Sequence, residues 1–256
     1  MNKINTIACT AFISLLSSSQ ATPVLKVGIV DNNPPFTFIK NGAYQGFEIE
    51  LAQLLCNKMQ VKCNFIAYPF VELLPALTDK KIDLIMGSMV ASNERKKHIN
   101  FSTKYYVNPA RFVANNTFNL NTDHLDFKGK TIAARTGTAQ EEFLKFNYGK
   151  VANVRSYATT EEGVKLLTSG AIDALFDLEV RITYNLLDQP IGKDYMFLGK
   201  RYTSETWFGE GISAGVRKTD PELLNAVNQA IDQSRKDNSY QTINAKYFNF
   251  DIFNLK

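Results

Sequence analysis

Arg95 is the first residue whose type and position suggest a chemical role. It follows the apolar run Ile82–Met86, which is typical of a buried strand, and a turn of small residues. A planar guanidinium can hold a carboxylate through two parallel hydrogen bonds. The charged run Glu94–Lys97 around it is, by itself, more typical of a solvated surface segment. Arg95 is therefore either a carboxylate-binding residue at the end of a strand or an ordinary surface arginine.

A second segment that could hold an anion is Gly137-Thr138-Ala139-Gln140, between a predicted strand and a predicted helix. The free backbone N–H groups at the start of a helix attract negative charge. Thr138 is also a suitable N-cap residue for that helix. The two roles are compatible, so both remain expectations.

Other kinds of chemistry have few candidate residues. The chain holds two histidines, His98 and His124, and no acid and base pair stands out from the surface charges. We therefore expect no metal, no cofactor and no catalytic residue. The net charge of +4 over 256 residues is too small for a nucleic-acid partner. The 45% hydrophobic content excludes a disordered chain.

Residues 1–21 have the pattern of a secretory signal. One lysine precedes a short apolar stretch, and small residues follow as far as Ala21, where we place cleavage. The apolar stretch is shorter than the roughly 20 residues that a membrane anchor needs. A buried N-terminal helix is the alternative interpretation.

The cysteines fit an exported protein. Cys9 lies inside the predicted signal, whereas Cys56 and Cys63 would close a short loop in the mature chain. In an oxidising compartment such a pair is typical of a disulfide. A metal pair is the rival interpretation, but no histidine or third cysteine lies nearby in the sequence.

Strands and helices alternate along the rest of the chain, and the pattern occurs twice. This order favours parallel sheets with helices on their faces. Two α/β units of about 100 residues fit the length better than one continuous sheet. Ligands of such folds bind at the carboxyl ends of strands and in the crevice between units. The predicted strands are Leu25–Val30, Val61–Ala67, Ile82–Met86, Thr131–Ala134, Ala171–Phe176 and Ile212–Val216, and the predicted helices include Ala139–Phe146, Pro221–Lys236 and Ser239–Tyr247.

The order and spacing of several short motifs, from about residue 24 to 250, resemble those of the periplasmic solute-binding proteins of ABC importers for amino acids. Among these, the chain is most similar to the lysine/arginine/ornithine and histidine group. The motifs are Gly46-Phe47-Glu48-Ile49-Glu50-Leu51, Cys56 through Cys63, Ile82-Asp83 with Ser92-Asn93-Glu94-Arg95, Phe101-Ser102 with Tyr105-Tyr106, Gly137-Thr138-Ala139-Gln140, Gln189-Pro190-Ile191-Gly192-Lys193, Phe208-Gly209-Glu210-Gly211 with Val216-Arg217-Lys218, and Lys246-Tyr247-Phe248.

The resemblance implies a fold and a function. The fold is a two-lobed α/β periplasmic-binding-protein fold of type II, with the ligand cleft between lobes joined by two crossover strands. Residues 22–109 and 201–256 would form lobe 1 and residues 110–200 lobe 2, with crossovers near Tyr106–Arg111 and Tyr195–Thr203. The protein would be a periplasmic monomer that captures an amino acid, a basic one being favoured, by lobe closure and delivers it to the membrane permease of an ABC importer.

The resemblance also implies a set of ligand-binding positions. Arg95 matches the carboxylate-binding arginine, Phe70 an aromatic wall, and Gly87 and Ser88 contacts to the ammonium. At several positions the chain departs from the group's pattern, and these departures weaken both the ammonium site and the preference for a cationic side chain. Val30 stands where the group has an aspartate, with Asp31 beside it, and Asn33 stands where the group has a stacking tyrosine. Val90 replaces a hydroxyl residue, and Leu178, with Asp177 beside it, stands where the group has an ammonium-binding aspartate. The complete set is Asp31, Asn33, Phe70, Gly87, Ser88, Val90, Arg95, Thr138, Ala139, Gln140, Asp177 and Leu178.

Two rival functions remain open. Cyclohexadienyl and related dehydratases share the fold, but they need a matched general acid and base. A sensor or adhesion module could keep the fold and lose transport, and a membrane-spanning or signalling segment would support that interpretation.

Overall fold

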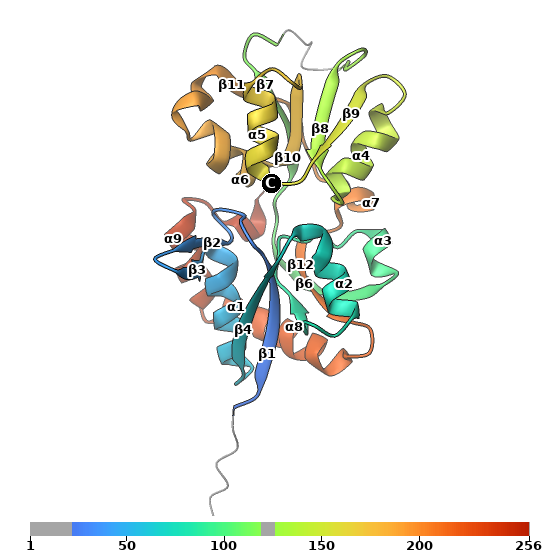
Figure 1. Ribbon diagram of the computed structural model, residues 1–256. Coiled ribbons are helices and arrows are strands. Elements are labelled where there is room, and N and C mark those ends of the chain that lie inside the picture. Colours follow the sequence, from blue (N-terminus) through green and yellow to red (C-terminus); the bar gives the residue numbers. More distant parts are fainter. Residues whose placement is uncertain (1–21, 119–125, 256) are drawn as a thin grey trace, which may run out of the picture.

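The computed structural model describes residues 22–118 and 126–255. Within these ranges the chain forms two five-stranded sheets and one two-stranded ribbon. The two large sheets lie one above the other, each with its own helices (Figure 1). The predicted two-lobed α/β fold is therefore confirmed. The predicted secretory signal, residues 1–21, lies outside the described residues.

Sheet 1, the lower one in Figure 1, has the strand order β4-β1-β5-β12-β6. β1 runs parallel to both of its neighbours, and β12 runs antiparallel to both of its own. Because β12 comes from late in the chain, this lobe contains both ends of the described chain. The strands are β1 (Val24–Val30), β4 (Lys62–Tyr68), β5 (Leu84–Ile85), β6 (Ile99–Tyr106) and β12 (Ile212–Arg217).

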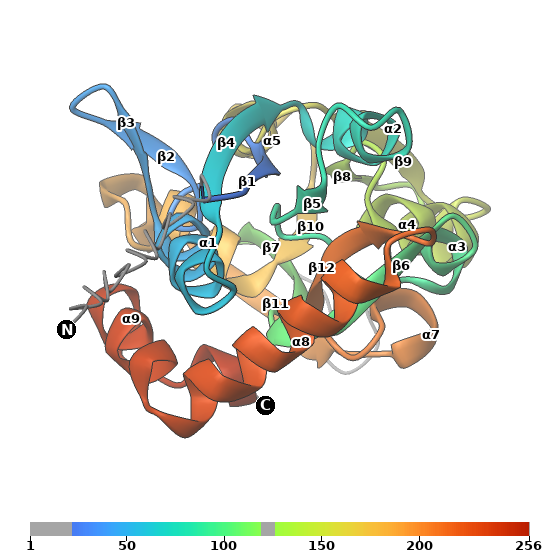
Figure 2. The same cartoon turned by 90° about the horizontal axis from the view of Figure 1, so that it is seen from below.

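Helices cover both faces of sheet 1. Successive strand residues point to opposite faces, so Leu84 and Ile85 pack into different core clusters. α2 packs on the Ile85 face, while α1, α8 and α9 lie together on the other (Figure 2). The elements of this lobe beyond its large sheet are β2 (Phe38–Lys40), β3 (Ala43–Gln45), α1 (Phe47–Lys58), the 3₁₀ turn Phe70–Glu72, α2 (Leu73–Thr78), α3 (Asn93–Lys96), α8 (Pro221–Lys236), α9 (Ser239–Tyr247) and the 3₁₀ turn Ile252–Asn254.

Sheet 2 has the strand order β11-β7-β10-β8-β9. β10, β8 and β9 are parallel, and β7 runs antiparallel to both of its neighbours. Phe112 and Val113, adjacent on β7, again pack into different clusters, one with α4 and the other with α5. The elements are β7 (Ala110–Asn115), β8 (Thr131–Arg135), α4 (Ala139–Tyr148), β9 (Asn153–Tyr157), α5 (Thr160–Thr168), β10 (Ala174–Leu178), α6 (Glu179–Ile182), the helical turns Thr183–Leu187 and Pro190–Asp194, and β11 (Tyr195–Tyr202).

The sheets are mixed, whereas the sequence predicted parallel ones. β6 ends at Tyr106 and β7 begins at Ala110, and the chain passes from sheet 1 to sheet 2 between them. It returns after Tyr202, through a segment that contains α7 (Glu205–Phe208). β7 and β12, the first strands after the two passages, each pair antiparallel with both of their neighbours, which the alternation of strands and helices does not reveal. The predicted lobe boundary at residue 200 falls within β11, so the boundaries stay a prediction.

The predicted disulfide between Cys56 and Cys63 is confirmed. It joins the end of α1 to the start of β4, and Cys56 is fully buried. The closed loop is short, with a sequence separation of 7. In the described ranges, no helix is both long and apolar enough to cross a membrane.

Replacing both cysteines by serine is expected to lower the free energy of unfolding by about 2–3 kcal/mol, because the bond restricts the unfolded chain. Urea unfolding of the oxidised wild type and of the double variant measures this difference. Dithiothreitol should destabilise the wild type by a similar amount and leave the double variant unchanged. Equal midpoints for the oxidised wild type and the variant would contradict the expectation.

Candidate functional site

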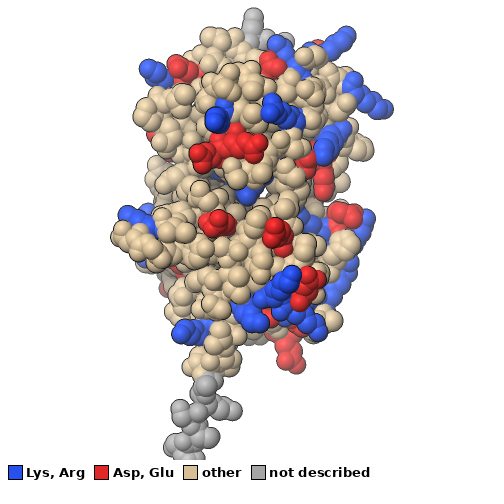
Figure 3. Space-filling view, in the orientation of Figure 1, with Lys and Arg blue, Asp and Glu red and all other residues tan. Residues whose placement is uncertain are grey.

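A small cavity lies between the lobes, and both lobes contribute to its wall. Figure 3 shows a hollow at this level with blue, cationic atoms inside it. The remaining volume is about 10 Å³, roughly the room of one water molecule. The lobes are thus closed on the site. The lining residues are Phe70, Ser88, Val90, Arg95, Arg135, Thr138, Gln140, Leu178 and Arg181.

Most of the predicted site residues meet at this cavity. Asn33 and Asp177 lie just behind the wall and bond to Arg181, which lines it. Asp31 is exposed, and neither Gly87 nor Ala139 is among the lining residues. The predicted residues that line the cavity are Phe70, Ser88, Val90, Arg95, Thr138, Gln140 and Leu178.

Arg95 bridges the two lobes. Its Nη1 donates to the carbonyl of Val90 at 2.9 Å, and its Nη2 donates to the carbonyl of Gly137 at 2.9 Å. Gly137 has a φ of +71°, and a Cβ there would lie 2.7 Å from Val71 across the cleft, so the turn needs glycine. Burial of the guanidinium lowers the pKa of Arg95 to about 10, so the group stays charged at neutral pH.

Two guanidinium groups lie close to the ring of Phe70. The guanidinium carbon of Arg95 lies 5.3 Å from its ring centroid, and that of Arg135 lies 5.4 Å away. Cations at this range are attracted to the face of an aromatic ring. The predicted aromatic wall therefore already contacts one arginine from each lobe.

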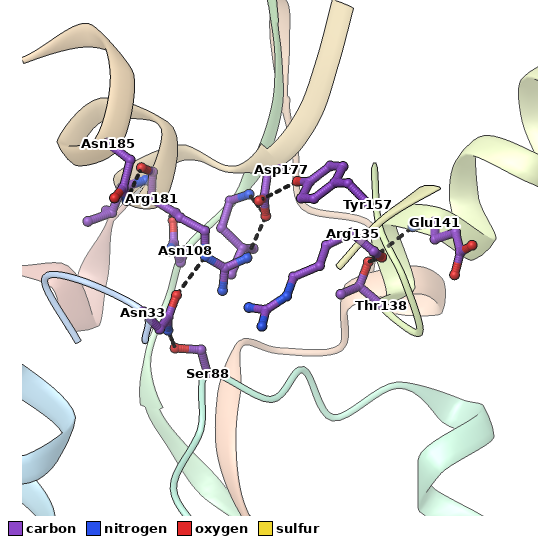
Figure 4. A network of polar contacts seen from close by, with 12 residues as sticks. Asn33, Ser88, Asn108, Arg135, Thr138, Glu141, Tyr157, Asp177, Arg181 and Asn185 are labelled. Atoms are coloured by element: carbon purple, nitrogen blue, oxygen red, sulfur yellow. Dashed lines mark hydrogen bonds and ion pairs between the residues drawn. The ribbon is translucent and has the colours of Figure 1, made fainter. Parts of the chain in front are cut away.

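Asp177 and Arg181 form a buried ion pair. Arg181 Nη1 donates to Asp177 Oδ1 at 2.6 Å, and the two side chains are 3% and 2% exposed. The same carboxylate also accepts from the backbone N–H of Leu178 and from the hydroxyl of Tyr157. Burial acts to lower the pKa of Arg181, but the interactions with Asp177, Tyr157 and Tyr106 together outweigh it, and the pKa is raised. Asp177 is thus occupied by protein partners (Figure 4).

Arg181 also reaches across the cleft. Its Nε donates to Asn33 Oδ1 of lobe 1 at 2.8 Å. One helical turn later, Asn185 Nδ2 donates to the carbonyl of Pro34 at 3.1 Å. Together with the bond from Arg95 to Gly137, these contacts hold the lobes closed.

Arg135 is the least satisfied of the three cavity arginines. Its Nε donates to the carbonyl of Ala158, but its buried Nη1 has no hydrogen-bond partner among the described residues. Burial, and then the charge of Arg181, lower the pKa of Arg135 to about 10. Figure 4 shows the side chain extending into the space between Arg181 and Thr138.

A buried polar cluster supports Ser88 from beneath. Glu48 Oε1 accepts from the Ser88 N–H at 2.6 Å and from the Tyr105 hydroxyl at 2.6 Å. The Ser88 hydroxyl donates to Glu48 Oε2 and accepts from Asn33 Nδ2 and Tyr106. Burial raises the pKa of Glu48, although its hydrogen bonds oppose that rise. A hydroxyl offers one donor and two acceptor sites, so all those of Ser88 are taken.

Thr138 caps α4, as the sequence allowed. Its hydroxyl donates to the carbonyl of Arg135 at 2.6 Å and accepts from the Glu141 N–H at 3.2 Å. Glu141 in turn accepts from the Gly137 N–H at 2.7 Å. Beside Thr138, Gln140 lines the cavity, and its Nε2 has no partner in the described part of the chain.

Sequence reasoning missed Arg135 and Arg181. Arg135 stands at the carboxyl end of β8, directly before the Gly137–Gln140 segment, which is where parallel sheets place ligand contacts. Arg181 lies four residues after Asp177, the spacing of a helical ion pair. Both signals were present in the sequence. No cluster of three or more histidine, cysteine, aspartate or glutamate residues that could hold a metal occurs in the described ranges.

The fold and the cleft match known proteins. The model of the family "Bacterial extracellular solute-binding proteins, family 3" matches residues 25–250. An L-arginine-binding protein of Pseudomonas aeruginosa is 35% identical, over 94% of this chain and 93% of that protein. A histidine-binding periplasmic protein of Salmonella typhimurium is 36% identical, over 95% of each chain.

A solved structure is similar as well. It is that of an ancestral amino-acid-binding protein described as a precursor of cyclohexadienyl dehydratase. It has a TM-score of 0.75 and 29% identity, and the match covers 88% of this chain and 95% of that one. With the family model spanning nearly the whole described chain, this protein belongs to the bacterial extracellular solute-binding proteins of family 3.

Proposed function

We propose that this protein is the periplasmic binding component of an ABC importer for an amino acid. The observation that carries the proposal is the closed cavity between two lobes, with Arg95 from one lobe facing the start of α4 from the other. A guanidinium and a helix N-terminus are both suited to a carboxylate. The sequence relationship to arginine- and histidine-binding proteins supports an amino acid as the ligand, and their names favour a basic one.

Binding acts through lobe closure. Each lobe holds only part of the site, so a ligand that bridges them stabilises the closed form by its differential affinity. About 10 Å³ is too little room for an amino acid, so the lobes must separate before a ligand enters. On entry, the ligand carboxylate takes the place of the Gly137 carbonyl on Arg95. The closed monomer then presents both lobes to the membrane permease.

A dehydratase activity finds little support at the cavity. Such chemistry needs a general acid and a base within reach of the substrate. In the described chain, no aspartate, glutamate or histidine lines the cavity, and the carboxylate of Asp177, behind its wall, is bound to Arg181. We therefore infer a binding protein and not an enzyme. Product formation on incubation with prephenate or arogenate would overturn this inference.

The function is tested by measuring thermal shifts of the purified protein with each standard amino acid. At least one is expected to raise the melting temperature, because a ligand that binds only the folded state stabilises it. In the same assay, Arg95→Ala should abolish that shift while the protein keeps its circular dichroism spectrum. Losing two charge-assisted hydrogen bonds from Arg95 to the ligand carboxylate corresponds to about 100-fold weaker binding or more.

Lys96→Ala is the matched control, since Lys96 is an exposed neighbour in the same charged run. It should leave the thermal shift unchanged. If no amino acid shifts the melting temperature, the proposed function fails. If Arg95→Ala binds as well as the wild type, the role given to Arg95 fails.

Asp177→Asn is expected to lower the free energy of unfolding by about 3–5 kcal/mol, because it leaves the buried Arg181 without its counter-charge. Asp188→Asn makes the same change at an exposed position of the same lobe and should alter stability by less than about 0.5 kcal/mol. Adding Arg181→Met to Asp177→Asn should recover part of the loss. A decrease of under about 1 kcal/mol for Asp177→Asn, measured by urea unfolding, would show that the ion pair is not needed.

A further inference from the structure

Positive charge is in excess at the cavity. Among the described residues, three arginines line it: Arg95 from lobe 1, and Arg135 and Arg181 from lobe 2. Within the described ranges, the one carboxylate in direct contact with them is that of Asp177, on Arg181. Two guanidinium groups therefore lack a carboxylate partner in the described structure. A single carboxylate on the ligand would neutralise the charge of one of them.

Neighbouring carboxylates do not remove this excess. Glu141 is engaged with Lys145 at 2.7 Å and with Ser156. Glu48 lies beneath Ser88, and burial raises its pKa, so it is a weaker counter-charge than an ordinary carboxylate. Glu142, the charge that acts on Arg95, is exposed to solvent, where screening is strong.

Two buried donors point to where a second anion would bind. Arg135 is 5% exposed and Gln140 is 3% exposed. Arg135 Nη1 and Gln140 Nε2 both lack a hydrogen-bond partner within the described chain, and both residues line the cavity. Leaving a buried donor unpaired is costly, and costlier for a charged group. Both groups are donors, so acceptor atoms on a ligand in the cavity would satisfy them.

The same cavity is unfavourable for a cationic side chain. Phe70, the wall that could stack on a cation, already has a guanidinium carbon within 5.4 Å of its ring centroid from each lobe. Asp177 is occupied, Leu178 is apolar, and the Ser88 hydroxyl has no acceptor site left. A second positive charge would therefore meet guanidinium groups and no free carboxylate.

We propose that the cavity recognises a small ligand with two carboxylates, an acidic amino acid: Arg95 and the start of α4 take one carboxylate, and Arg135 with Gln140 takes the other. This rests on the proposed function and specifies its ligand class. The guanidinium carbons of Arg95 and Arg135 each lie within 5.4 Å of one ring centroid, so a single small molecule can reach both. The names of the relatives favour a positively charged ligand side chain, whereas the arginines of this cavity favour a negatively charged one.

Isothermal titration of the purified protein, after dialysis from denaturant to remove any bound solute, tests the proposal. The probes are L-glutamate, L-aspartate and succinate, with L-glutamine as the uncharged isostere and L-arginine, L-lysine and L-histidine as cationic ligands. L-glutamate or L-aspartate should bind at least tenfold more tightly than L-glutamine and than any cationic amino acid. Tighter binding of a cationic or neutral amino acid would overturn the proposal and leave the function of amino-acid binding intact.

The succinate titration distinguishes the second carboxylate subsite from the binding of an amino acid. If succinate binds and no amino acid does, the second carboxylate subsite is supported and the proposed amino-acid function fails. If none of the three acids binds, the subsite proposal is wrong, whichever other ligand binds.

Arg135→Leu should weaken binding of the acidic ligand at least tenfold and abolish the preference over L-glutamine. The matched control is Arg155→Leu, which removes the same charge from an exposed position on β9, paired with Ala133 of β8. It should leave the affinity unchanged. If Arg135→Leu does not fold, Gln140→Leu tests the same subsite and should also reduce the preference. Unchanged preference in a folded variant at either position would contradict the proposal.

Discussion

Asp177 Oδ1 and Arg181 Nη1 lie 2.6 Å apart in the closed cleft, and both side chains are almost fully buried. Burying a pair of charges is favourable only where geometry and further hydrogen bonds compensate for their lost hydration. Tyr157 and the Leu178 N–H supply those bonds on the acid, and Asn33 supplies one on the base. The pair thus fixes the end of β10, connects it to lobe 1, and occupies a carboxylate that lies directly behind the cavity wall.

That use of Asp177 has consequences for recognition. In the family resemblance, an acidic residue beside β10 holds the ligand ammonium, and Asp177 was the candidate offered by the sequence. Here the charge of Asp177 is paired with that of Arg181, one helical turn away. The cavity is left with guanidinium groups from both lobes around Phe70. Its chemistry is that of anion recognition, on a fold whose named relatives include arginine- and histidine-binding proteins.

Much of this structure could be predicted from the sequence because its signals are local. Pro221–Lys236 and Ser239–Tyr247 form helices with the predicted bounds, and Cys56 and Cys63 form the predicted disulfide. β6 and β7 were not predicted, because their pairing depends on where the chain passes between lobes. Arg135 was missed because it ends an otherwise apolar strand, where one polar residue looks like an ordinary boundary. Arg181 was missed because its bond to Asn33 forms only in the folded, closed molecule, and its four-residue spacing from Asp177 does not show that the pair is buried at the cleft.

Guanidinium groups of both lobes are placed to recognise two carboxylates of one ligand. A crystal structure of the protein with its tightest-binding small ligand would show those contacts. We expect one carboxylate within hydrogen-bond distance of Arg95 and the first turn of α4, and a second on Arg135 Nη1 and Gln140 Nε2. A ligand with a cationic or apolar group against Arg135, or one bound away from Arg95, would contradict the claim.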